Sequence, residues 1–123
     1  MSSSKKPGKQ RKARMLASLK DRANFAKAHA SKELRKELKR RSIALRKGDS
    51  VKVLRGFHKK FSGKVSGIDR KKSRVFIEGL KLKKSDGTEK PLGIQASNLL
   101  VADVYRDDEK RFKRKTKALK KGK

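Results

Sequence analysis

Hydrophobic and polar residues alternate through the middle of the chain, from about residue 42 to residue 105. Val51 and Val53 alternate with polar neighbours, and similar short runs recur as far as Val104. A period of two is typical of strands that bury one face, and the frequent β-branched residues also favour strands. Five short, closely spaced strands with no long helix between them favour a small closed barrel over an open sheet. The expected fold class is therefore mainly β.

Turns separate the expected strands. Gly56 and Gly63 bracket a basic loop, a polar turn follows at residues 70–73, and Asp86-Gly87 indicates an exposed hairpin tip. The strands expected between these turns are Val51–Leu54, Lys64–Asp69, Val75–Ile77 continuing into Leu80–Leu82, a strand at Ile94, and Leu99–Val104.

One of these strands ends in an alternation of leucine and lysine. Leu80 and Leu82 stand between Lys81 and Lys83. Because successive side chains of a strand point to opposite faces, both leucines are expected on one face and both lysines on the other, which would be wet and cationic.

The residues before the barrel are compatible with helix. Leu34 and Leu38 are four positions apart and follow a serine that suits an N-cap, which predicts a short helix over Ser31–Arg40. This small apolar stripe would dock on the barrel or on a partner. An earlier helix within Met15–Ala28 stays an open alternative.

Composition divides the chain into three parts. Residues 1–41 form a basic N-terminal extension that contains the short helix, residues 42–105 form the barrel, and residues 106–123 form a basic C-terminal tail. Their net charges are +12, +9 and +7. Residues 1–14 and the tail are rich in cations and poor in apolar side chains, so both are expected to be disordered in isolation.

The total charge indicates the kind of partner. The chain has 123 residues with 40 Lys and Arg against 12 Asp and Glu, a net charge of +28. A charge of this size points to a polyanion such as nucleic acid. Only a third of the residues are hydrophobic and Trp is absent, so one small core is the most that the chain can bury.

The chain offers little to other classes of function. It has no Cys, and its two histidines, His29 and His58, are far apart, so neither a zinc site nor a nucleophile with its base can be assembled. No enzyme activity, cofactor, metal or small-molecule substrate is expected. No apolar run is long enough to cross a bilayer, and a soluble, cytoplasmic protein without a membrane partner is expected. The Ser-rich, basic start is faintly similar to a transit peptide, although Lys outnumbers Arg there.

The candidate nucleic-acid-binding residues are the cations of the loops, the outer strand faces and the N-terminal extension, with two ring side chains beside them. Cations bind phosphates and release condensed counterions, which gives strong and salt-sensitive affinity. Those of the loop after Leu54 and of the turn at residues 70–73 are expected at adjacent ends of the barrel. The candidates are Arg46, Lys47, Lys52, Arg55, Phe57, His58, Lys59, Lys60, Lys64, Arg70, Lys71, Lys72 and Arg74, and, in the extension, Lys5, Lys6, Arg11, Lys12, Arg14, Arg40 and Arg41.

Two phenylalanines of the basic loop have different prospects. Phe57 lies next to Gly56 at the expected loop tip, where its ring is available to stack on an exposed base. Phe61 either stacks in the same way or belongs to the barrel core. His58 is most simply a neutral residue that forms hydrogen bonds within the loop.

The basic loop and its two strands resemble a KOW motif. The matching residues are Val51 to Gly56, then Lys59, then Gly63-Lys64-Val65 and Ile68-Asp69. The motif usually has glycine directly after the loop lysine, whereas this chain has Lys60. The departure bears on the backbone path of the loop and adds a cation at its tip.

The resemblance extends beyond the motif to about residues 31–101. The segments SKELRKELKRRSIALRKGDSVKVLRG, RKKSRVFIEGL and DGTEKPLGIQASNLLV are similar to the archaeal and eukaryotic form of the universal large-subunit ribosomal protein twenty-four. The resemblance implies an SH3-like barrel that binds large-subunit ribosomal RNA beside neighbouring ribosomal proteins, acts early in subunit assembly and lies near the peptide exit. The alternative is a KOW-type transcription or chromatin factor that binds nucleic acid.

Overall fold

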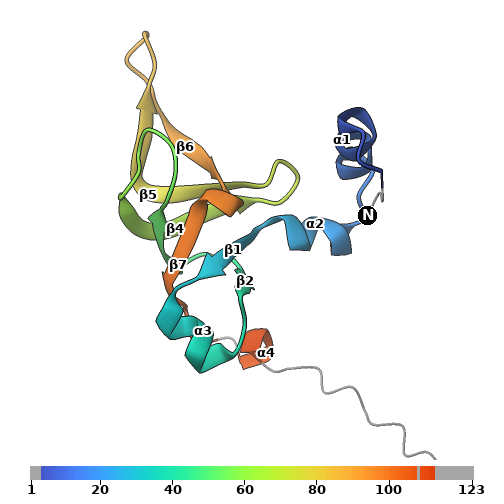
Figure 1. Ribbon diagram of the computed structural model, residues 1–123. Helices are drawn as coiled ribbons and strands as arrows, with labels where there is room; N and C mark the ends of the chain where they lie inside the picture. Colours follow the sequence, from blue (N-terminus) through green and yellow to red (C-terminus); the bar gives the residue numbers. More distant parts are fainter. Residues whose placement is uncertain (1–3, 108, 113–123) are drawn as a thin grey trace, which may run out of the picture.

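The computed structural model describes residues 4–107 and 109–112, and within these ranges the protein is mainly β. Seven strands form one curled sheet in the order β2-β1-β7-β3-β4-β5-β6, with short helices at its margins (Figure 1). The strands are β1 (Lys27–Ala30), β2 (Ser42–Ala44), β3 (Ser50–Val53), β4 (Ser62–Asp69), β5 (Arg74–Lys83), β6 (Glu89–Gln95) and β7 (Leu99–Asp103). The helices are α1 (Pro7–Met15), α2 (Leu19–Phe25), α3 (Lys32–Leu38) and α4 (Glu109–Phe112), and a 3-10 turn, η1 (Ala96–Asn98), precedes β7.

Most neighbouring strands of the sheet are antiparallel, and the last strand along the chain returns to pair with β3. β3 to β6 follow one another as antiparallel pairs, and β7 returns to pair with β3. β1 then adds parallel to β7, and β2 pairs antiparallel with β1. Register shifts within β4 and β5 bend these two strands, and η1 contacts β1. The bent sheet is consistent with a small barrel-like fold.

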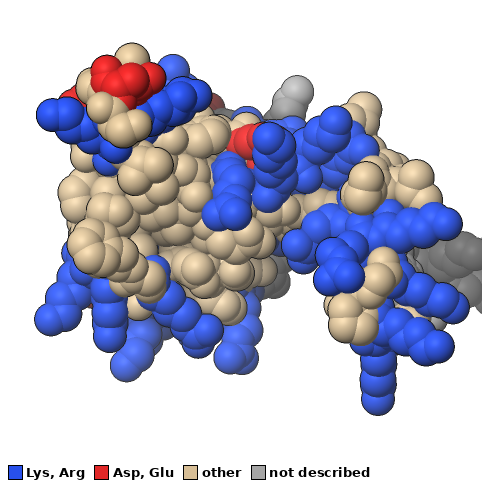
Figure 2. Space-filling model, turned by 90° about the horizontal axis from the view of Figure 1, so that it is seen from above, with Lys and Arg blue, Asp and Glu red and all other residues tan. Residues whose placement is uncertain are grey.

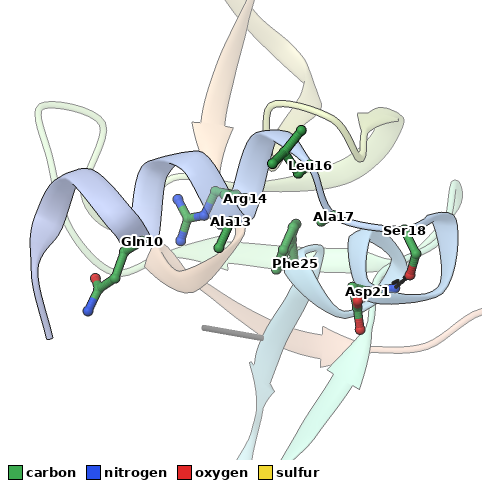
Figure 3. Close-up of a pocket in the computed structure, with 8 residues that line it drawn as sticks. All are labelled: Gln10, Ala13, Arg14, Leu16, Ala17, Ser18, Asp21 and Phe25. Atoms are coloured by element: carbon green, nitrogen blue, oxygen red, sulfur yellow. Dashed lines mark hydrogen bonds between the residues drawn. The ribbon is translucent and has the colours of Figure 1, made fainter. Parts of the chain in front are cut away.

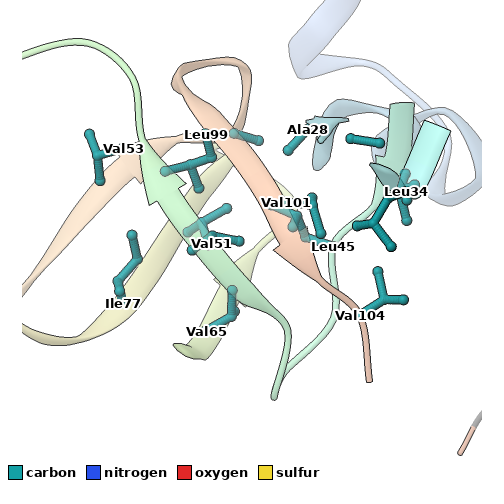
Figure 4. Packing of buried hydrophobic residues seen from close by; sticks show 14 of the residues in the cluster. Ala28, Leu34, Leu45, Val51, Val53, Val65, Ile77, Leu99, Val101 and Val104 are labelled. Carbon is teal, nitrogen blue, oxygen red and sulfur yellow. The ribbon is translucent and has the colours of Figure 1, made fainter. Parts of the chain in front are cut away.

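The core consists of the alternate residues of these strands. Val51, Val53, Leu99 and Val101 are each at most 1% exposed and lie side by side at paired positions of β3 and β7 (Figure 4). Burial of each such side chain contributes about 1.5–3 kcal/mol. The alternation read from the sequence is therefore confirmed as the origin of the core.

The expected helix after Ser31 is confirmed as α3. The Ser31 hydroxyl oxygen accepts a hydrogen bond from the Leu34 N–H at 3.2 Å, as an N-cap does. Leu34 is buried and Leu38 packs against the same cluster. The apolar stripe therefore docks on the core of its own chain.

The N-terminal extension contains more structure than the pattern predicted. α2 lies within the segment left open as a helix, but Lys27–Ala30 is a strand, whose Ala28 and Ala30 enter the core. Residues 7–15, expected to be disordered in isolation, form α1, which begins with Pro7 and consists largely of good helix formers. Because β1 belongs to the sheet, the sheet begins before residue 42. The expected division of the chain into an extension, a barrel from residue 42 and a tail stays a prediction.

The alternation of leucine and lysine at the end of β5 enters the core only in part, and its lysines are exposed as expected. Leu80 is buried, but Leu82 is 56% exposed. The register between β5 and β6 shifts between Phe76 and Lys81, and Gly79 has a φ of +83°. After this shift Lys81, Leu82 and Lys83 are all exposed, so the end of the hairpin extends past the core.

The start of the C-terminal tail packs against the body of the molecule. Phe112 in α4 packs against the core cluster, and Arg106 forms an ion pair with Glu37 of α3 at 3.0 Å. The expectation of a disordered tail is therefore wrong for these residues. Residues 113–123 lie outside the described ranges.

Candidate nucleic-acid interface

The loop between β3 and β4 is closed by backbone hydrogen bonds. The Val53 N–H donates to the Phe61 carbonyl at 2.8 Å, and the Lys60 N–H donates to the Val53 carbonyl at 2.9 Å. Within this frame Arg55, Lys59 and Lys60 are exposed. No described residue forms a side-chain hydrogen bond or ion pair with these three cations, so the loop presents them to solvent from a fixed backbone.

Lys60 adopts the backbone conformation that glycine favours. Its φ is +74°, in the left-handed region. An L-residue there costs about 1–2 kcal/mol relative to its preferred conformations. The backbone at this position is thus left-handed, as suits the glycine usual in KOW motifs, and a lysine adopts this conformation at an energetic cost.

The two loop phenylalanines have separated roles. Phe57 is 97% exposed, and its ring meets the His58 ring edge to face at 5.1 Å between centroids. Phe61 is partly buried and packs against the core; a Cβ at Gly63 would lie 3.2 Å from its ring and 2.7 Å from Ile77. Phe61 therefore belongs to the barrel, and Phe57 stays the stacking candidate.

The turn between β4 and β5 is not adjacent to this loop. The eight residues of β4 separate the two, a span of up to about 25 Å at the usual rise per residue. The Asp69 carboxylate accepts hydrogen bonds from the N–H groups of Lys71 and Lys72 at 2.9 and 3.1 Å, which orders the turn. Arg74 donates to the Gly93 carbonyl of β6 at 3.1 Å. The expectation of adjacent barrel ends is therefore wrong, and the cations form two groups.

Other candidates lie near these two groups. Lys52 and Lys64 are exposed on the outer faces of β3 and β4. Arg46 and Lys47 are exposed in the turn between β2 and β3, and they share a cavity with Arg70. The end of the barrel opposite the β3–β4 loop therefore holds cations from two separate turns.

The N-terminal candidates lie on a cationic lobe made by α1 and α2. Lysines and arginines cover this lobe and project from the sheet, and few acidic side chains are visible on the face shown (Figure 2). A cavity of about 590 Å³ lies between α1 and α2, and in it the Arg14 guanidinium stands 5.5 Å from the Phe25 ring centroid (Figure 3). All five candidates on this lobe are exposed: Lys5, Lys6, Arg11, Lys12 and Arg14.

Arg40 forms hydrogen bonds within the protein. Its guanidinium donates to the carbonyls of Arg111 at 2.9 Å and Phe112 at 3.4 Å, which are the last carbonyls of α4. Cations at a helix C-terminus satisfy unpaired carbonyls and complement the helix dipole. Arg41, the next residue, is exposed.

A buried ion pair between Asp49 and Arg111 was not foreseeable from the sequence. Asp49 is 0% exposed, and Arg111 donates to its two oxygens at 2.8 and 2.5 Å. The N–H groups of Arg46 and Tyr105 also donate to the Asp49 carboxylate, at 2.8 and 3.0 Å. Arg111 further donates to the Ala44 carbonyl at 2.7 Å. Gly48-Asp49 reads as an ordinary turn, and Arg111 stands in a basic run, so neither residue is distinctive in sequence.

The hairpin of β5 and β6 carries internally paired acids. The Lys81 ammonium donates to the Glu89 carboxylate at 2.7 Å, and this hydrogen bond and charge raise the pKa of Lys81. The Thr88 hydroxyl and N–H donate to the Asp86 carboxylate, which lowers the pKa of Asp86. Both pairs are solvent-exposed, and they make the hairpin less cationic than the loops.

Two other kinds of site find no support in the described ranges. Residues 4–107 and 109–112 contain no group of three or more side chains placed to hold a metal ion. None of the helices described in the chain has the length and hydrophobicity needed to cross a membrane.

Comparison with known proteins identifies the family. A family model that describes the eukaryotic ribosomal proteins L26 and their archaeal L24 counterparts matches residues 4–117. A protein named large ribosomal subunit protein uL24 from Methanosphaera stadtmanae is 44% identical over 108 residues, which cover 88% of this chain and 92% of the relative. Proteins of the same name from Methanothrix thermoacetophila, 44% identical over 89% of the chain and 95% of the relative, and Methanospirillum hungatei, 43% identical over 88% and 90%, are also similar. The chain belongs to the family of ribosomal proteins called L26 in eukaryotes and L24 in archaea.

Proposed function

We propose that this protein is a structural component of the large ribosomal subunit and binds large-subunit ribosomal RNA through its basic loops and arms. Family membership and the names of the relatives support the subunit. The observation that carries RNA binding is the β3–β4 loop, a hydrogen-bonded backbone that holds Arg55, Lys59 and Lys60 in solvent beside an almost fully exposed Phe57. In the proposal the protein has a structural rather than a catalytic role.

The β3–loop–β4 unit is assigned to a KOW motif within an SH3-like barrel. Gly56, Lys59 and Gly63 stand at the matching positions, and the positive φ at Lys60 fits the place of the usual glycine. In this assignment the loop cations bind RNA phosphates and 2′-hydroxyls, and Phe57 stacks on an unpaired base.

The resemblance to the family supplies the biological setting of the proposal. The protein acts early in subunit assembly and lies near the peptide exit, beside neighbouring ribosomal proteins in cytoplasmic ribosomes. The cationic lobe of α1 and α2 contributes further phosphate contacts. The family match over residues 4–117 favours this role over a transcription or chromatin factor.

Sedimentation of cell extracts tests the subunit assignment. The protein is expected to remain with the large subunit after a moderate-salt wash, because many phosphate contacts must be broken together. Its release into the unbound fraction, with the other large-subunit proteins retained, would contradict the assignment and favour the transcription or chromatin factor.

Binding to purified RNA tests the electrostatic part. The logarithm of the association constant for a large-subunit RNA fragment is expected to fall linearly with the logarithm of salt concentration, by roughly 0.7–0.9 per phosphate contact. A binding constant that does not change with salt would falsify phosphate recognition as the basis of the interaction.

A further inference from the structure

A cavity at the start of β3 brings together cations from two turns. It has a volume of about 700 Å³, within the range of about 300–1,000 Å³ typical of small-molecule sites. Arg46 and Lys47 line it from the turn between β2 and β3, and Arg70 lines it from the turn between β4 and β5. This end of the sheet is opposite the β3–β4 loop, so the cavity is separate from that loop and its cations.

An aromatic ring forms part of the same cavity. Tyr105 follows β7 and is 52% exposed. Its ring packs against Gly48, where a Cβ would lie 3.5 Å from the ring, and Gly48 has a φ of +93° that favours glycine. The Tyr105 N–H donates to the buried Asp49 carboxylate at 3.0 Å. Both the backbone and the ring of Tyr105 are thus held in place, while half of the side chain stays open to solvent.

The hydroxyl of this tyrosine already has a partner. It donates to the Asp107 carboxylate, and this hydrogen bond raises the pKa of Tyr105. Asp107 also lines the cavity and would repel a phosphate placed beside it. The lining therefore combines three cations with one aromatic ring and one carboxylate, which is hydrogen-bonded to that ring's hydroxyl. Leu45 and Ile68 add apolar surface to its lining.

We infer that this cavity binds one unstacked nucleotide of ribosomal RNA, with the base against Tyr105 and the phosphate among Arg46, Lys47 and Arg70. The inference rests on the proposed function and adds a second base-binding site to it. Base–aromatic stacking beside cations is the usual way in which proteins hold single-stranded nucleic acid. Three cations against one hydrogen-bonded carboxylate make the site complementary to a nucleotide.

The composition of the chain provides a direct reporter. Tyr105 is the only Tyr and there is no Trp. In full-length protein with labelled tyrosine, the ring protons of Tyr105 are expected to shift upfield in NMR spectra on addition of an adenosine oligoribonucleotide of about ten residues, a length that suits single-strand sites. Fluorescence polarisation of labelled RNA measures total binding in the same samples.

Matched variants separate stacking from folding and from general charge. Tyr105→Leu is expected to weaken binding of the oligonucleotide about tenfold, whereas Tyr105→Phe retains most of the affinity because it keeps the ring. Arg70→Ala is expected to lower the salt dependence by about 0.7, and Lys83→Ala, which removes an exposed cation outside the cavity, is expected to leave the Tyr105 shift unchanged. Circular dichroism checks that each variant is folded.

The alternatives give different results. RNA binding without a shift of Tyr105 would overturn the cavity site and leave the proposed function intact, whereas no RNA binding at low salt would overturn the proposed function itself. Adenosine monophosphate that shifts Tyr105 at the same concentration as the oligonucleotide would indicate a free-nucleotide site and contradict the assignment to RNA. Polyglutamate that produces the same upfield shift would show that the cavity recognises acidic chains, which also contradicts the inference.

Discussion

The two ends of β3 use positive charge in opposite ways. At its start, the carboxylate of Asp49 is buried and Arg111 donates to both of its oxygens. At its end, the cations of the β3–β4 loop stand in solvent with no described side-chain partner. The four residues of β3 separate the buried Asp49–Arg111 ion pair, which uses one cation inside the protein, from the β3–β4 loop, which exposes several cations to solvent. In a chain with 40 basic residues, residue type alone does not reveal which charges are exposed and which are bonded internally.

The difference has an energetic reason. A buried charge loses hydration and persists only where a partner and further hydrogen bonds compensate, as the N–H groups of Arg46 and Tyr105 do for Asp49. An exposed lysine keeps its hydration and counterions until RNA displaces them. Substitutions in the Asp49–Arg111 pair should therefore change the free energy of unfolding. Substitutions of the β3–β4 loop cations should change the affinity for RNA.

Asp49→Ala is expected to have the largest effect. It leaves Arg111 without its buried partner and two N–H groups without an acceptor, so the free energy of unfolding should fall by about 3–5 kcal/mol. Urea denaturation measures the loss. Glu78→Ala, which removes an exposed carboxylate from β5, should change the value by less than about 0.5 kcal/mol. Equal effects of the two changes would contradict the structural role of Asp49.

Arg111→Ala should cost less than Asp49→Ala, about 1–3 kcal/mol, because Asp49 keeps its two backbone donors. Arg111→Lys is the conservative comparison, and it should recover only part of the loss because an ammonium lacks the planar pair of N–H groups with which a guanidinium binds both carboxylate oxygens. Full recovery in the same denaturation experiment would show that charge, and not the paired geometry, matters.

Removal of two loop cations, Arg55→Ala with Lys59→Ala, should leave stability unchanged and weaken RNA binding roughly tenfold at low salt. Both side chains are exposed, and neither forms a hydrogen bond or ion pair with a described residue that folding would lose. Polarisation titrations at several salt concentrations measure the effect. Equal affinity of the double variant and the parent protein would mean that the loop is not part of the interface.

Lys60→Gly should have the smallest effect. Glycine relieves the left-handed strain at φ +74°, but it also increases the entropy of the unfolded chain, so a gain of about 0.5–1 kcal/mol in stability is expected. Lys60→Val provides the contrast and should lower stability, since a β-branched residue tolerates positive φ poorly. A stabilising valine would contradict the account of strain at this position.

Much of the sheet could be predicted from local pattern. β3, β4, β7 and α3 carry alternation or helical spacing and lie where the sequence predicts them. β1 could not be recognised, because Lys-Ala-His-Ala has weak strand propensity and its partner β7 lies far along the chain. Its pairing depends on the assembled sheet.

The sequence predicted which kinds of residue form the candidate site, but not how these residues are arranged in space. The exposed positions of Phe57 and Lys59 follow from a glycine-bounded loop. The separation of the loop from the turn at Arg70 depends on strand length and hairpin geometry, and the internal use of Arg40 and Arg111 depends on contacts with residues distant in sequence. Charge patterns contain no information about such partners.

The salt dependence of RNA binding by Lys59→Ala and Arg40→Ala tests the central claim most directly, because each variant loses one positive charge. Lys59 is exposed in the loop, whereas Arg40 donates to the carbonyls at the end of α4. Lys59→Ala should make the slope shallower by about 0.7–0.9, and Arg40→Ala should leave it unchanged in the folded protein. Equal changes, or a larger change for Arg40→Ala, would contradict the division between displayed and internally bonded cations.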